Sequence, residues 1–410
     1  MISISAFSAL LAASYPGLVF CNDDLLEAES PSKITVSSSF TFSATVYEDA
    51  DSVWNILKSY SLLNVKEGKG TMHRLLAQAL RHSQQESEYR SNARICLYAM
   101  QSMWAFKADQ TSTWKESLQI LDHVKSVVSH AASCNFDRKD RLRAGRLSIE
   151  AGIYSAMALN AFIDAQQSFE LAILFVENSK DNHPSLRRAR AEALHELGRV
   201  FRYQGKYDES EQSLKEALSI YKACSSRDQT AKKRVADTLH ELGVLEVKKH
   251  NLDSATRFLE LSLDMRENIG NPELNATDSA ATLHQLAAIM VARKPPHLEK
   301  AKYLLQQALG LSTQIGQRAA TLKQLARVTI RQGSLDLAET HLEQALDLYM
   351  QLYGENKNHM NIAAVKFQQG ALARQREQWE QAGSHFSACL CIRRNVYAYR
   401  SEEHTSELQS

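Results

Sequence analysis

LHELG at residues 194–198 recurs as LHELG at 239–243, as LHQLA at 283–287 and as LKQLA at 322–326. The first residues of these segments lie 45, 44 and 39 positions apart. Each segment is followed by a small, a large and a small residue at spacings of four and three, which describes one face of a helix. These triplets are Ser210, Leu214 and Ala217; Ala255, Leu259 and Ser262; Ala301, Leu305 and Ala308; and Ala338, Leu342 and Ala345. The pattern predicts repeated pairs of helices, A and B, with the triplets buried between them.

A turn separates the two helices of each predicted pair. Gly205-Lys-Tyr-Asp208, His250-Asn-Leu-Asp253 and Gly333-Ser-Leu-Asp336 occupy corresponding positions. We expect glycine to end helix A in the left-handed conformation. We also expect Asp208 and Asp336, each followed three residues later by glutamate, to cap helix B. The two extra residues at Pro295-Pro296 predict a longer turn in the third pair, because proline cannot continue a helix.

The composition of the chain favours an all-α fold. The 410 residues include only 15 Gly and 6 Pro, and strong helix formers dominate from about residue 85 onward. A repeat array is also how a chain of this length adds core area one unit at a time. Weaker versions of the triplet occur at Ala165, Phe169 and Ala172; at Ala382, Phe386 and Cys389; and at Trp114, Ser117, Leu121 and Val124. We therefore predict a solenoid of about seven hairpins over residues 88–399.

This pattern resembles the tetratricopeptide repeat, and its period near 44 resembles the kinesin light chain type. The resemblance implies a right-handed superhelix of hairpins that binds proteins or peptides on the concave face lined by the A helices. Reading the columns onto that face gives the expected partner groove. It comprises His195, Arg199, Arg202, Tyr203, His240, Lys248, His284, Lys323, Arg327, Arg331 and Arg374.

The expected groove is rich in basic residues, so we predict that it binds an acidic or carboxylate-bearing segment, with arginines making bidentate contacts. The alternative is that these are solvated helix faces, balanced by Glu192, Glu196, Asp237 and Glu241. The repeated histidine column does not predict a metal site, because neighbouring A helices stand about 10 Å apart.

The segment before the repeats has the order helix, strand, strand, helix. Residues 52–59 predict a helix, and residues 61–65 and 71–73 predict strands around a glycine turn. Residues 74–81 have helical periodicity. This order resembles the winged-helix end of STAND-class NB-ARC/TPR proteins and implies a small winged-helix-like α+β domain over residues 1–84. In that family a Met-His-Asp motif contacts bound ADP. Met72 and His73 match it, whereas Arg74 replaces the acid, so the resemblance implies a nucleotide contact for His73; the alternative is that His73 is a packing residue.

No catalytic motif accompanies this resemblance. The chain contains no phosphate-binding loop, nucleophile elbow or HExxH, and we expect neither enzymatic activity nor a cofactor or metal. The preferred interpretation is the sensor arm of a STAND signalling protein whose nucleotide-binding domain is not in this chain. The alternative is a free-standing adaptor resembling kinesin light chain.

Charge and cysteine content limit the partners and the compartment. A formal net charge of +1 provides no general attraction to nucleic acid or membranes. Six scattered cysteines indicate free thiols in a reducing compartment, and no apolar run is long enough to cross a membrane. No basic residue precedes the apolar stretch at residues 6–21, which favours a buried helix over a signal peptide. We therefore expect a cytoplasmic protein.

The final residues, RSEEHTSELQS at 400–410, match no repeat column. They equal the in-frame translation of a common sequencing-library adapter. We interpret residues 400–410 as an artefact that breaks from the preceding helix.

Overall fold

A computed structural model describes residues 2–3, 63–66, 69–72, 85–108, 110–177, 183–224, 229–269, 272–354 and 359–407. The chain divides into two compact units, Met1–Ile220 and Tyr221–Ser410. Within the described residues from 85 onward the fold consists of fourteen α-helices and one 3-10 helix at Thr111–Thr113. The helices form antiparallel pairs, so the all-α prediction for this part of the chain is confirmed.

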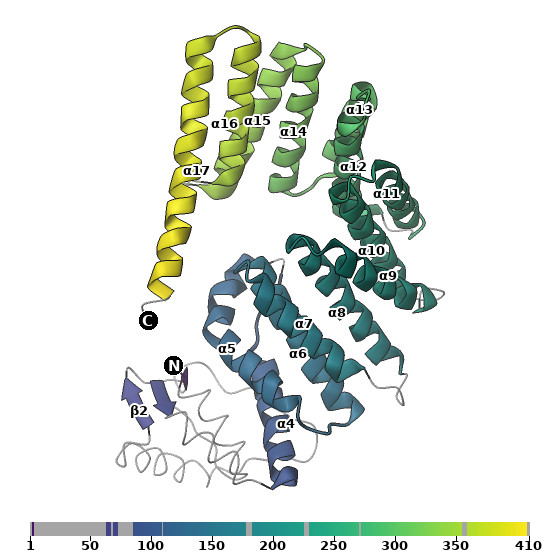
Figure 1. The fold of residues 1–410 in the computed structure, drawn as a ribbon, viewed down its shortest axis with the longest axis vertical. Coiled ribbons are helices and arrows are strands. Elements are labelled where there is room, and N and C mark those ends of the chain that lie inside the picture. The colour runs from purple at the N-terminus through teal and green to yellow at the C-terminus, as the bar shows by residue number, and fades with distance from the viewer. Residues whose placement is uncertain are drawn as a thin grey trace. The chain divides into compact units, whose positions relative to one another are not determined.

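The first unit contains the first five of these helices and most of the sixth. They are α4 (Glu86–Met103), α5 (Trp114–Ala131), α6 (Arg138–Met157), α7 (Phe162–Val176), α8 (Pro184–Tyr203) and α9 (Tyr207–Cys224), the last of which crosses the boundary between the units. α6 packs against α7, and α8 packs against both of them (Figure 1).

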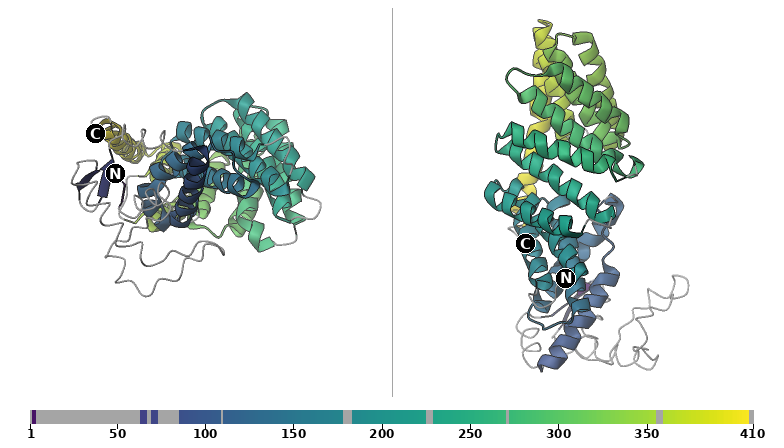
Figure 2. Two further views of the ribbon diagram at one scale, coloured as in Figure 1. Left: turned by 90° about the horizontal axis from the view of Figure 1, so that it is seen from below. Right: turned by 90° about the vertical axis from the view of Figure 1, so that its right-hand side faces the viewer.

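The second unit contains four more pairs. They are α10 (Gln229–Lys248) with α11 (Leu252–Glu267), α12 (Pro272–Ala292) with α13 (Leu298–Leu311), α14 (Ile315–Arg331) with α15 (Leu335–Tyr353), and α16 (Met360–Gln375) with α17 (Trp379–Glu407). The two helices of each pair run side by side, as the green and yellow segments of Figure 2 show.

The buried triplets form the core of the repeats. All twelve triplet residues, from Ser210 to Ala345, have at most 1% of their surface exposed. The weaker triplets are also largely buried, with Ala165, Phe169 and Ala172 at 0%. The sequence pattern therefore identified the helix faces that pack together.

Glycines at one position of several A helices let the B helix of the same pair approach closely. A Cβ atom on Gly243 would lie 2.6 Å from Leu259 Cγ, and one on Gly198 would lie 2.7 Å from Leu214 Cγ. Such distances are well inside the optimum of about 3.5–4.0 Å for carbon atoms. Glycine in this column therefore provides room for the large residue of the triplet. At the same position, α12 and α14 carry Ala287 and Ala326 instead of glycine.

The turns confirm the predicted helix ends. Gly205 and Gly333 have φ of 78° and 79°, and His250 takes the same left-handed region at 64°. Schellman-type bonds close these turns, for example from Ser334 N–H to Thr329 O at 2.9 Å. In the third pair the corresponding bond runs from His297 to Met290, seven residues rather than five, so the two extra residues lengthen the turn and leave the pair intact.

The expected capping box at Asp336 is wrong. α15 begins at Leu335 with Ser334 as its N-cap, and no side chain caps it. Asp336 is therefore the second residue of the helix, where its charge favours the positive end of the helix dipole.

Near the N-terminus, β2 (Leu63–Lys66) and β3 (Lys69–Met72) form the predicted antiparallel hairpin. β1 (Ile2–Ser3) pairs with the other edge of β3, which the sequence pattern did not predict. The helices expected at residues 52–59 and 74–81, His73, and the apolar stretch at residues 6–21 lie outside the described residues. The described part of this segment does not support a winged-helix domain.

At the other end, α17 continues through Glu407. The expectation that residues 400–410 break from the preceding helix is therefore wrong for residues 400–407.

Candidate functional site

The first unit places four of the expected groove residues on α8. His195 is only 5% exposed, so it offers little surface to a partner, and its assignment to the groove is corrected. Arg199 pairs with Glu196 at 2.8 Å, and the Arg202 guanidinium lies 4.5 Å from the ring centroid of Tyr203. Tyr203 is 56% exposed and stacks on Phe162, with ring centroids 5.1 Å apart. Arg199 and Arg202 are thus engaged by neighbouring side chains.

In the second unit, His240 belongs to a polar network that enters the core. Its Nδ1 lies 2.9 Å from Thr282 Oγ1, which also accepts a hydrogen bond from Arg266 Nη1. Arg266 is 4% exposed and donates through Nη2 to Asp237 Oδ1 at 2.9 Å. A buried arginine requires such partners, because an unpaired buried charge is costly. The network therefore holds the His240 ring against α12.

His284, Lys323 and Arg327 form a cluster of basic side chains on α12 and α14, which we call the basic cluster. The three side chains are half-buried. Burial and the charges of Lys323 and Arg327 lower the pKa of His284 to about 4. Burial and the Arg327 charge lower the pKa of Lys323, and burial and Arg331 lower that of Arg327. Lys323 and Arg327 therefore repel one another in partly desolvated surroundings, and the His284 ring beside them is uncharged near neutral pH.

No carboxylate compensates the basic cluster within the part of the chain that the structure describes. Neither Lys323 nor Arg327 forms an ion pair there, and Arg327 Nε is buried without a hydrogen-bond partner. Lys323 Nζ lies 5.9 Å from the ring centroid of Tyr349, a distant cation–π contact. The cluster thus carries positive charge that the described residues leave unneutralised.

The remaining expected groove residues lie at the ends of their helices. Arg331 donates through Nη1 to Val291 O at 3.2 Å, which ties α14 to α12. Lys248 and Arg374 are exposed. The structure therefore brings His284, Lys323, Arg327 and Arg331 together and does not gather the full expected set.

Sequence reasoning missed a set of contacts between successive repeats. In each, a residue at the end of an A helix binds an acid in the first turn of the preceding B helix. The contacts run from Arg293 Nη2 to Asp253 Oδ1 at 2.8 Å, from Gln332 Nε2 to Glu299 Oε1 at 2.7 Å, and from Arg376 Nη2 and Nη1 to Asp336 Oδ1 and Glu339 Oε2 at 2.6 and 2.8 Å. These acids serve as acceptors, and one of them, Asp336, is a residue that the sequence suggested as a cap. Their spacing of 33–40 residues from the donors is the signal that could have revealed them.

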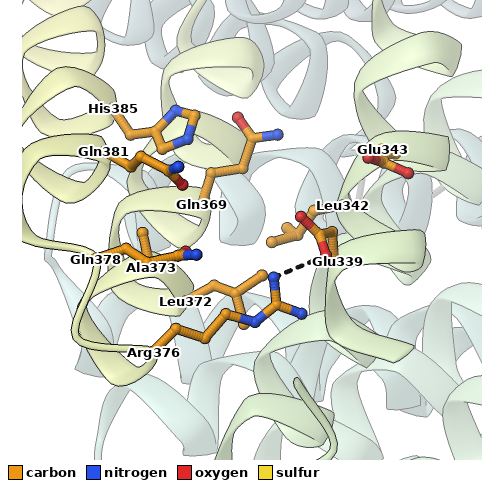
Figure 3. Close-up of a pocket in the computed structure, with 10 residues that line it drawn as sticks. All are labelled: Glu339, Leu342, Glu343, Gln369, Leu372, Ala373, Arg376, Gln378, Gln381 and His385. Carbon is orange, nitrogen blue, oxygen red and sulfur yellow. Dashed lines mark hydrogen bonds and ion pairs between the residues drawn. The ribbon is translucent and has the colours of Figure 1, made fainter. Parts of the chain in front are cut away.

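A shallow pocket of about 50 Å³ lies between α15, α16 and α17 (Figure 3). Leu342, Leu372 and Ala373 provide its apolar surface, and Gln381 and His385 face it from α17. Burial and Lys366 lower the pKa of His385. Arg376 at the pocket edge is already held by Glu339. A pocket of this size accommodates only a side-chain tip or a few waters.

Within the described ranges, no helix is long and apolar enough to cross a membrane. The same residues contain no group of three or more His, Cys, Asp or Glu side chains arranged to hold a metal ion.

A family model described as tetratricopeptide repeat matches residues 190–228 and 318–359, which correspond to the pairs α8–α9 and α14–α15. The chain contains tetratricopeptide repeats. Such repeats generally serve as non-catalytic scaffolds for protein interaction. A comparison with curated proteins gives no match.

Several solved structures resemble this chain at low identity. The apo form of RapI is 10% identical, with 75% of this chain and 99% of that chain covered and a TM-score of 0.51. BtubC from P. vanneervenii is 18% identical over 58% of this chain and 92% of that chain, with a TM-score of 0.48. A STAND protein with a tetratricopeptide repeat sensor from Pyrococcus horikoshii is 14% identical over 86% of this chain and 59% of that chain, with a TM-score of 0.44. At these identities the likeness concerns the fold alone, and it does not decide between a STAND protein and a kinesin-light-chain-like protein.

Proposed function

We propose that this protein is a non-catalytic interaction scaffold whose A helices in the second unit bind an acidic segment of a partner protein. The observation that carries the proposal is the basic cluster of His284, Lys323 and Arg327, in which the charges of Lys323 and Arg327 have no counter-charge among the described residues. A bound carboxylate would relieve their mutual repulsion and would gain charge-assisted hydrogen bonds from Arg327. The corresponding part of the first unit is less suited to bind an acidic partner, because the charge of Arg199 is already paired with Glu196.

Peptide arrays graded in Asp and Glu content test this function. We expect binding to increase with acidic content and to fall at least about tenfold in the double variant Lys323→Glu/Arg327→Glu, a loss of about 1.4 kcal/mol. Lys248→Glu is the matched control, because Lys248 is exposed in the same unit and lies outside the basic cluster. Equal losses in the double variant and the control, or binding that ignores acidic content, would refute the proposal.

We further propose that the repeats act as the sensor arm of a STAND signalling protein, in which partner binding biases a nucleotide switch. The Met72-His73 pair in the sequence, which resembles the nucleotide-contacting motif of that family, motivates this assignment. A full-length transcript whose reading frame encodes a phosphate-binding loop upstream of Met1 is the expected result. A transcript without that loop favours the adaptor and makes His73 a packing residue.

A further inference from the structure

The basic cluster contains a neutral base beside two cations. His284 lies on α12, and Lys323 and Arg327 lie on α14. These two A helices belong to successive pairs and are in contact. His284 makes no hydrogen bond or ion pair among the described residues. Because its pKa is about 4, the ring is uncharged near neutral pH. The cluster in the free protein therefore carries its charge on Lys323 and Arg327 alone.

Charged and titratable groups face this part of α12 from the helices packed against it. From the neighbouring helices they are His240, Lys233 and Asp237 from α10, Arg266 from α11, and Lys323, Arg327 and Arg331 from α14. Arg266 pairs with Asp237, and Lys233 pairs with Asp278 of α12 itself. α13 also packs on α12, and none of its charged residues contributes to the shift of the His284 pKa. Apart from burial, the two cations of α14 keep the ring neutral.

We propose that His284, Lys323 and Arg327 form one anion subsite in which binding of a carboxylate is accompanied by uptake of a solvent proton on the His284 ring. This inference rests on the proposed function and adds its regulation by pH. A carboxylate between the two cations offsets the repulsion that keeps His284 uncharged, and it favours the imidazolium directly. Binding of the anion and binding of the proton must then strengthen each other, because linkage is reciprocal.

The size of the effect follows from the two protonation states. If the bound anion returns the pKa of His284 from about 4 to its ordinary value of about 6.5, the affinity at about pH 5.5 exceeds that at about pH 8 by roughly tenfold. The direction is fixed by the sign of the shift. The complex binds the proton more tightly than the free protein, so affinity rises as the pH falls.

A blocked pentaglutamate peptide is the probe for affinity, measured by calorimetry with the full chain at both pH values. We expect about tenfold tighter binding and net proton uptake at the lower pH. His284→Gln should still bind the peptide but should lose this pH dependence. His385→Gln is the matched control, since His385 also has a lowered pKa but lies in the pocket beside α17, and it should keep the dependence.

Sulfate provides a second measurement, because its charge does not change over this pH range. In proton–nitrogen NMR spectra, sulfate should raise the pKa of His284 in the wild type and have no such effect in Lys323→Met/Arg327→Met. That double variant should itself raise the pKa of His284 in the absence of anion, and the dispersion of its backbone amide resonances shows that it has folded.

The possible failures are distinguishable. Peptide binding that is independent of pH, or that varies equally in His284→Gln, overturns the proton linkage and leaves the proposed function standing. Acidic segments that bind on the arrays without moving the His284 resonance place the anion elsewhere and overturn the subsite. An absence of binding to any acidic peptide overturns the proposed function itself.

Discussion

Replacing Gly243 by alanine tests whether close packing of A and B helices holds the repeats together. The new Cβ would lie 2.6 Å from Leu259 Cγ and 2.8 Å from Leu259 Cδ2, and Leu259 is fully buried. Alanine gains about 1 kcal/mol of helix propensity over glycine. Overpacking of a filled core costs about 1–3 kcal/mol. We therefore expect a net loss of up to about 2 kcal/mol in the free energy of unfolding.

Gly383→Ala is the matched control, because a Cβ there meets no atom within 4 Å. It lies within α17 and should gain up to about 1 kcal/mol. Urea denaturation followed by circular dichroism measures both variants. A third variant, Gly243→Ala/Leu259→Ala, separates the two effects, since the truncated side chain removes the overlap and the two substitutions should be less harmful together than their sum. Stabilisation of similar size in Gly243→Ala and Gly383→Ala would refute the packing argument.

Three further predictions concern charged side chains of the second unit. The free energy of unfolding should rise with pH between about 4 and 6.5, because the unfolded chain binds a proton at His284 that the folded chain does not. This rise in the free energy of unfolding is at most about 3 kcal/mol. His284→Gln should remove the contribution of the histidine. Urea titrations across this pH range measure both proteins. Arg376→Met should cost less than about 1 kcal/mol, since the acids that it binds are exposed, and should speed hydrogen exchange in α16 if the contact joins the repeats. Arg266→Met should cost about 2 kcal/mol by leaving Asp237 without its partner, and adding Asp237→Asn should recover part of that loss in the same denaturation assay.

The sequence by itself determined the repeating architecture. Leu214, Leu259 and Leu342 are buried because their spacing from small residues defines one helix face, and this local regularity is visible in any single repeat. The left-handed turn residues follow from equally local chemistry at Gly205 and Gly333. The hairpin of β2 and β3 was also predicted. The sequence pattern did not predict β1, which pairs with the other edge of β3.

Only the tertiary structure decided which charges are paired and which are left over. A column pattern placed Arg199 and Arg327 in equivalent positions, yet Arg199 binds Glu196 and Arg327 has no such acid among the described residues. Likewise Asp336 has the spacing of a cap and instead binds Arg376, which lies 40 residues further along the chain. A contact such as that of Asp336 with Arg376 depends on side chains that successive repeats bring within about 3 Å, and a periodic sequence pattern specifies the backbone face without specifying such contacts.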